Sequence, residues 1–172
     1  MAEVRPFQGL RYEPNVVGSL DGVLCPPFDV ISASLQEELY GRSPYNAVRL
    51  ELGMGSAGDD DGSNVYTRAA QFFASWQWEG ALMREPQPSY YLLRHRFSDR
   101  GGRRLERWGF TACVRLEEFD RRVVLPHEET LGAPKEDRLA LMEACHANVS
   151  PIMAFYRQGR EKRITLAMRG IT

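Results

Sequence analysis

The chain has 172 residues and a net charge of −1, and 43% of its residues are hydrophobic. This length fits one domain, and the apolar fraction is large enough to build a hydrophobic core. The near-zero charge provides no general attraction to nucleic acid or to an anionic membrane, so we expect neither as a partner.

The three cysteines lie far apart, without the Cys-x-x-Cys spacing that is typical of zinc sites. Isolated cysteines of this kind favour a reducing compartment. The first residues lack the apolar run of a signal peptide, and no stretch approaches the length of a membrane span. The sequence therefore predicts a cytoplasmic protein.

Residues 4–12 predict an extended edge, because Pro6 and Gly9 interrupt any regular strand. The dipeptide Pro26-Pro27 also favours extended backbone, and Asp29 follows it. An acid on such a stiff loop is either a metal or hydroxyl ligand or a residue that caps its own turn. Both interpretations of Asp29 stay open.

The first helix is predicted over residues 33–42, where Ser34 and Glu37 have the spacing of a capping box. Residues 45–52 then alternate between apolar and polar side chains, which is the period of a half-buried strand. Asn46 and Arg49 lie near the start of this predicted strand. Arg49 is the better anion ligand, although a salt-bridged surface arginine explains it equally well.

A second helix is predicted over residues 64–80, because large apolar side chains recur there every three or four positions. Residues 89–97 and 105–116 are rich in strand-forming side chains and flank a turn, so they predict a long hairpin that forms the main part of the sheet. Short strands are expected at residues 123–125 and 152–156.

Charged side chains that could bind an anion follow the strand predicted at residues 123–125. A helix opens there at Pro134, since proline is tolerated in a first turn, and it extends to about residue 147. Lys135 and Arg138 are three residues apart and share a face near the free N–H groups of that turn. The arrangement favours phosphate or carboxylate binding.

Further reactive side chains precede this helix. Glu128 and Asp137 offer carboxylate oxygens suited to magnesium, and His127 can transfer a proton near neutral pH. The alternative is a solvated loop followed by a capped surface helix, because charged residues are common at helix starts.

Six motifs occur in a characteristic order along the chain. They are Arg5-Pro-Phe-x-Gly9-Leu-Arg-Tyr12, Pro26-Pro-Phe-Asp-Val-Ile31, Ser43-Pro-Tyr-Asn-x-Val-Arg-Leu50, Pro126-His-Glu-x-Thr130, Lys135-x-Asp-Arg138 and Asn148-x-Ser-Pro151. In this order they resemble the bacterial and archaeal family named domain of unknown function 1015. The resemblance covers residues 3 to about 156.

The predicted elements give an α+β fold with a mixed, largely antiparallel sheet, a long hairpin and about three helices. The resemblance implies that this fold is similar in part to the ParB-like and sulfiredoxin proteins. Family members are longer and carry an Asp-Gly-His-His-Arg-Tyr element that is missing here. We therefore expect residues 1–156 to be the N-terminal part of the family domain and residues 157–172 to be a divergent, truncated tail.

The similarity to ParB-like proteins implies nucleotide-dependent phosphoryl transfer, with Mg²⁺ and ATP or another nucleotide as cofactors and a small-molecule phosphate or nucleotide as ligand. The implied phosphate ligands are Arg49, Thr130, Lys135 and Arg138, the metal ligands Glu128 and Asp137, the catalytic residues His127 and Glu128, and the further site residues Asp29, Asn46 and Asn148. The alternatives are a non-enzymatic ParB-like regulatory or nucleic-acid-associated module and an inactive fragment.

Overall fold

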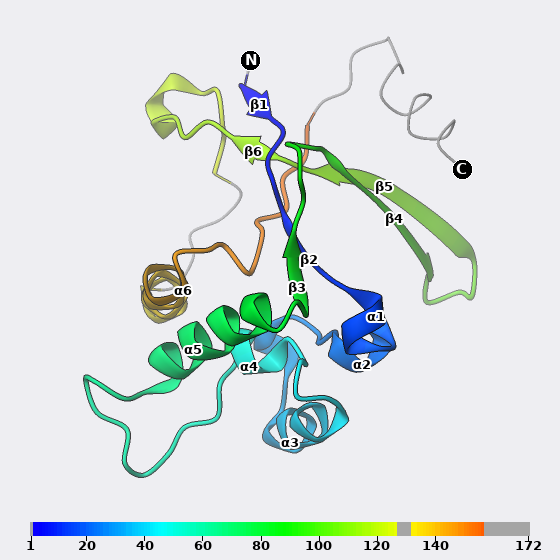
Figure 1. The fold of residues 1–172 in the computed structure, drawn as a ribbon. Helices are drawn as coiled ribbons and strands as arrows, with labels where there is room; N and C mark the ends of the chain where they lie inside the picture. Colours follow the sequence, from blue (N-terminus) through cyan, green and yellow to red (C-terminus); the bar gives the residue numbers. More distant parts are fainter. Residues whose placement is uncertain (1, 127–131, 157–172) are drawn as a thin grey trace. The chain divides into compact units, whose positions relative to one another are not determined.

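The computed structural model describes residues 2–126 and 132–156 and divides the chain into two compact units (Figure 1). In the described part of the chain, the first unit consists of residues 2–9, 85–126 and 152–156, and the second unit consists of residues 10–84 and 132–151. Each unit combines segments that lie far apart in the sequence.

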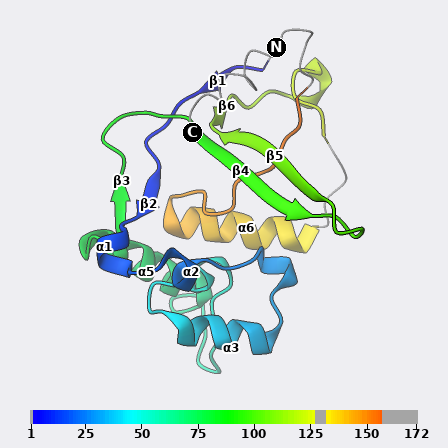
Figure 2. The same ribbon diagram turned by 90° about the vertical axis from the view of Figure 1, so that its right-hand side faces the viewer.

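The second unit is mainly helical (Figure 2). Its helices are α1 (Pro14–Val17), α2 (Leu20–Val23), the 3-10 turn η1 (Phe28–Val30), α3 (Ala33–Arg42), α4 (Val48–Glu51), α5 (Val65–Trp78) and α6 (Gly132–Cys145). Its two strands, β2 (Leu10–Tyr12) and β3 (Leu82–Arg84), pair antiparallel.

The bounds of α3 agree with the prediction, and α5 lies within the predicted range. Ser32 caps α3 by accepting a hydrogen bond from the Leu35 amide, so the cap lies two residues before the predicted Ser34. Asn64 caps α5 and forms a capping box with Thr67, which satisfies N–H groups that the helix itself leaves free.

Aromatic and aliphatic side chains of α5 and α6 form the core of the second unit. Trp76 is 2% exposed and contacts the rings of Tyr12, Tyr45 and Phe72. Leu141 of α6 belongs to the same buried cluster. The apolar periodicity of residues 64–80 therefore identified core positions correctly.

The strand predicted over residues 45–52 is wrong, because this segment contains the short helix α4. Val48 and Leu50 are both buried, so their alternation reflects a segment that is enclosed on several sides rather than a pleated strand. The Asn46 side chain accepts a hydrogen bond from the Val48 amide, and this local bond favours the helical turn.

The first unit contains the predicted hairpin. Strands β4 (Tyr91–Ser98) and β5 (Arg104–Thr111) pair antiparallel, with Tyr91 opposite Thr111 and Ser98 opposite Arg104. The pairing ends before residue 112, because β6 (Cys113–Val114) pairs instead with β1 (Val4–Arg5). The 3-10 turn η2 (Phe119–Arg121) follows.

Two predicted strands of the first unit are wrong. Residues 123–125 and 152–156 lie in the described part of the chain and belong to no strand there. Leu125 is 67% exposed and Ile152 is 91% exposed, so neither segment gains the burial and pairing that stabilise a strand. In the hairpin, the His95 side chain is exposed and contacts Arg107.

Gly9 explains part of the motif near the N-terminus. Its amide donates a hydrogen bond of 2.6 Å to the Tyr91 hydroxyl, and a Cβ atom at this position would lie 2.8 Å from that hydroxyl. Only glycine permits so close an approach.

The structure confirms the α+β class, with helices and small antiparallel strand pairs. Within the described residues, no helix combines the length and apolar character that crossing a membrane requires.

Candidate functional site

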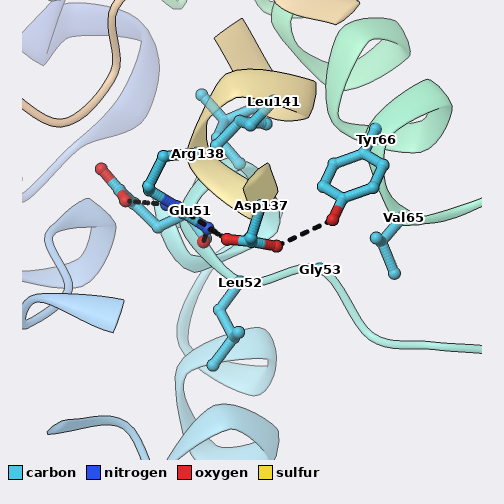
Figure 3. A pocket seen from close by; sticks show the side chains of 9 residues that line it. Glu51, Leu52, Gly53, Val65, Tyr66, Asp137, Arg138 and Leu141 are labelled. Atoms are coloured by element: carbon cyan, nitrogen blue, oxygen red, sulfur yellow. Dashed lines mark hydrogen bonds and ion pairs between the residues drawn. The ribbon is translucent and has the colours of Figure 1, made fainter. Parts of the chain in front are cut away.

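Only part of the predicted site falls in the described residues. His127, Glu128 and Thr130 lie outside them, so their predicted roles stay predictions. Asp137 and Arg138 lie on α6, where they contact residues of α4 and α5 (Figure 3). These contacts all lie within the second unit.

Arg138 is the centre of a polar network. Its Nη1 atom donates to Glu51 Oε2 at 3.0 Å, and its Nη2 atom donates to the Glu51 carbonyl at 2.8 Å. Its Nε and Nη2 atoms donate to Asp137 Oδ2 at 2.8 and 2.5 Å. The guanidinium group also lies 4.1 Å from the centre of the Phe28 ring. Four of the five N–H groups of an arginine are thus engaged within the described residues.

Glu51 and Asp137 each have a second donor. Ser150 Oγ donates to Glu51 Oε2 at 2.5 Å, and the Tyr66 hydroxyl donates to Asp137 Oδ1 at 2.8 Å. This hydrogen bond to the Asp137 carboxylate raises the pKa of Tyr66, because it stabilises the protonated phenol. The network therefore joins α4, α5, α6 and the segment that follows α6.

A small pocket lies beside this network. It is lined by Glu51, Tyr66, Asp137 and Arg138 together with the apolar side chains of Leu50, Leu52, Val65 and Leu141 and the backbone of Gly53 (Figure 3). Its cavity volume is about 40 Å³. A site for a drug-sized molecule occupies about 300–1,000 Å³, whereas one water needs about 10–15 Å³. The pocket therefore fits a few waters or one small anionic group, and not a whole nucleotide.

Lys135 is exposed and lies one turn before Arg138 on α6. The helix begins at Gly132, two residues earlier than predicted, so Lys135 is its fourth residue and Arg138 its seventh. The prediction that both cations lie near the first turn therefore holds for Lys135 alone. Arg138 lies deeper in the unit, and its side chain is only 20% exposed.

Arg49 does not join this network. Its guanidinium group lies 4.3 Å from the centre of the Tyr40 ring and 5.4 Å from that of Phe72, and its Nη2 atom donates to the Tyr40 carbonyl at 2.9 Å. Its Nε atom is buried and has no hydrogen-bond partner among the described residues. Arg49 is therefore a cation held between two rings, which offset part of the cost of its burial.

The remaining predicted site residues lie apart from the pocket. Asn46 is fully buried and donates to the carbonyls of Gly22 at 2.8 Å and Leu24 at 3.2 Å, so its amide joins α4 to the segment around α2. Asp29 and Asn148 are both exposed.

Sequence reasoning missed Glu51, Tyr66 and Ser150 as members of the network. Glu51 was assigned to a strand, and Tyr66 and Ser150 carry no pattern that relates them to Arg138. Ser150 belongs to the Asn148-x-Ser-Pro151 motif, so that motif was the available signal.

Metal binding has limited support in the described residues. Among them, no three His, Cys, Asp or Glu side chains gather in a way that could hold a metal ion. Glu51 and Asp137 approach each other, but Arg138 lies between their carboxylates and neutralises them. A magnesium site would therefore also need Glu128, which lies outside the described residues.

A comparison with known protein families identifies the family of this chain. The model of the family described as "Protein of unknown function (DUF1015)" matches residues 4–170, which is nearly the whole chain. The chain belongs to the DUF1015 family. The match extends past residue 156, where the motifs themselves ended. Searches of curated proteins and of solved structures found no match for this DUF1015 protein.

Proposed function

We propose that this DUF1015 protein binds a phosphate group at the pocket beside Asp137 and Arg138, as the nucleotide- or phosphate-binding part of a magnesium-dependent phosphotransferase. One observation carries the proposal: the Asp137 carboxylate accepts hydrogen bonds from both the Arg138 guanidinium and the Tyr66 hydroxyl at the edge of the pocket. Two such donors would serve a phosphate oxygen equally well.

In this proposal the Asp137 carboxylate occupies the position of an anionic ligand. Its side chain is 38% exposed, so it can turn away at small cost, whereas Glu51 at 15% exposure keeps Arg138 in place. Lys135 lies one turn away on α6 and is exposed, so it adds positive charge for the remaining phosphates of a nucleotide. The pocket volume fits one phosphate group, and the rest of the ligand extends beyond it.

Magnesium binding would favour the replacement of the Asp137 carboxylate by a phosphate. A divalent cation bound by Asp137 together with Glu128 would draw the Asp137 carboxylate away from Arg138 and Tyr66. Both donors would then be free for phosphate, so phosphate and metal would bind cooperatively.

Calorimetry with pyrophosphate, ATP, ADP and CTP, each with and without MgCl₂, tests the proposal. The variant Asp137→Asn removes the competing charge but preserves the shape of the side chain. We expect it to bind pyrophosphate about tenfold more tightly than the wild type without magnesium, and to lose the gain that magnesium gives the wild type.

The control is Asp120→Asn, which removes an exposed carboxylate in the first unit and should leave both affinities unchanged. Lys135→Ala should weaken the binding of ATP and CTP more than that of pyrophosphate, because each triphosphate has one more phosphate group, which lies farther from the pocket. Failure of the wild type to bind any of the four ligands, or identical binding by Asp137→Asn, contradicts the proposal.

A further inference from the structure

The hairpin β4–β5 carries a charge that the composition of the whole chain conceals. Residues 91–111 contain six arginines and two acids, which gives them a net charge of +4. Since the chain carries −1, all other residues together carry −5. The near-zero total is therefore the sum of one strongly basic element and an acidic remainder.

These arginines lie on an exposed ribbon. The β4–β5 sheet has two strands, and every side chain from Leu92 to Ser98 is exposed, so both faces of β4 are accessible. The register places Arg94, Arg96 and Arg104 on one face, and His95 and Arg107 on the other. Three arginines thus lie on one face of the ribbon, and Arg107 adds positive charge on the other face.

The two acids of the hairpin do not neutralise it. Arg94 and Arg96 share the Glu106 carboxylate at 3.9 and 3.3 Å, and Arg103 pairs with Asp99 at 3.2 Å. Exposed pairs of this kind contribute little stability and exchange readily for other anions. The arginines can therefore bind phosphates at little cost to the fold.

The geometry favours double-stranded DNA among polyanions. The major groove of B-DNA is about 12 Å wide and admits a two-stranded ribbon, whereas the major groove of A-form RNA is too narrow. A ribbon with cations on both faces suits a groove that has phosphates on both sides. A single strand would instead need exposed rings for stacking beside the cations. On the face of the three arginines the Trp108 ring is covered by Arg94 at 5.3 Å, and the exposed Phe97 ring lies on the opposite face.

We propose that the β4–β5 hairpin is a docking element for double-stranded DNA, with Arg94, Arg96 and Arg104 as its main phosphate ligands. The hairpin of a second copy is a poor occupant, because two hairpins of charge +4 repel each other. The other explanation for the arginines is protection of the open strand edges from aggregation.

The test is fluorescence anisotropy of a labelled DNA duplex with the full chain over a series of salt concentrations. The variant Arg94→Gln/Arg96→Gln/Arg104→Gln removes the three ligands. We expect its plot of log K against log salt to be shallower by about 3, because each lost phosphate contact reduces the slope by about 1.

The matched control is Arg42→Gln/Arg121→Gln/Arg122→Gln, which removes the same charge from exposed positions outside the hairpin and should change the slope by less than about 1. Circular dichroism melting verifies that both variants fold. An equal reduction of the salt slope in the control overturns the proposal. Absence of duplex binding by the wild type at low salt also overturns it. Tighter binding of a single strand, duplex RNA or polyglutamate overturns the assignment to duplex DNA. If the wild type does not bind DNA and the hairpin variant aggregates, the arginines instead protect the open strand edges from aggregation.

Discussion

Arg138 in the second unit and Arg96 in the first carry the same guanidinium group in opposite surroundings. The Arg138 side chain is 20% exposed and contacts two carboxylates, a carbonyl and a ring. The Arg96 side chain is 66% exposed and shares one carboxylate with Arg94. Charges of the first kind hold helices together and can bind an anion only when a neighbouring carboxylate such as Asp137 turns away, whereas charges of the second kind are directly available to a partner.

The largest effect should come from removing the partly buried cation of Arg138. Arg138→Ala leaves the Glu51 and Asp137 carboxylates close together without their shared partner, so we expect the free energy of unfolding to fall by about 3 kcal/mol. Urea denaturation measures this loss. Arg42→Ala is the control, because its pair with Glu38 is exposed and should cost less than about 0.5 kcal/mol. Equal losses of stability in the two variants would refute the distinction between partly buried and exposed arginine pairs.

A second pair of substitutions compares a buried and an exposed neutral side chain. Asn46→Ala should lower the free energy of unfolding by about 2 kcal/mol, because the carbonyls of Gly22 and Leu24 and the Val48 amide lose their partner. Asn148→Ala, at an exposed position, should change it by less than about 0.5 kcal/mol. Thermal melting of both variants decides whether Asn46 has this structural role.

Alkaline pH should weaken the second unit through Cys25. Burial, with the nearby Glu51 carboxylate, raises the pKa of this thiol from 9.0 to about 11. Between these pH values the unfolded chain loses the thiol proton while the folded chain retains it. The contribution of the protonated Cys25 thiol to the free energy of unfolding is therefore complete below pH 9 and is lost as the pH rises toward 11. We expect the free energy of unfolding to fall by about 1 kcal/mol over this pH interval, since the thiol is partly exposed.

Melting curves at a series of pH values isolate this contribution. Cys25→Ala should lose less stability than the wild type over the same pH interval, whereas Cys113→Ala, at an exposed position of the first unit, should follow the wild type. Identical curves for all three proteins would show that Cys25 does not titrate as expected.

The smallest effect on stability is expected in the hairpin. Arg94→Gln/Arg96→Gln should change the free energy of unfolding by less than about 0.5 kcal/mol, because the pairs with Glu106 and the contact of Arg94 with the Trp108 ring lie at the surface. Denaturation in urea measures the change. A loss comparable to that of Arg138→Ala would mean that the hairpin arginines support the fold.

Local signals in the sequence were reliable where one element decides its own conformation. The cap and apolar period of α5 predicted its range, and the turn-rich residues 98–103 predicted the hairpin. Alternation failed at residues 45–52, because a short enclosed helix buries side chains on more than one face. The strands predicted at residues 123–125 and 152–156 are also absent, because a strand needs a partner and none is present for these described residues.

The candidate site was predictable only in part for the same reason. The spacing of Lys135 and Arg138 predicted an anion-binding pair on one helix, with Asp137 as a metal ligand beside them. Glu51, Tyr66 and Ser150 lie 87, 71 and 99 residues away from their partners on α6 or α4, and no local rule connects such positions. Only the structure showed that the Arg138 guanidinium already donates hydrogen bonds to the carboxylates of Glu51 and Asp137.

The sequence by itself determined the family, the α+β class, the long helix α5 with its cap and the β4–β5 hairpin, because these depend on short-range periodicity, turn chemistry and motif order. Only the tertiary structure decided which cations are buried and which are free. Burial depends on contacts between distant segments, and it separates the Arg138 network from the exposed arginines of β4–β5.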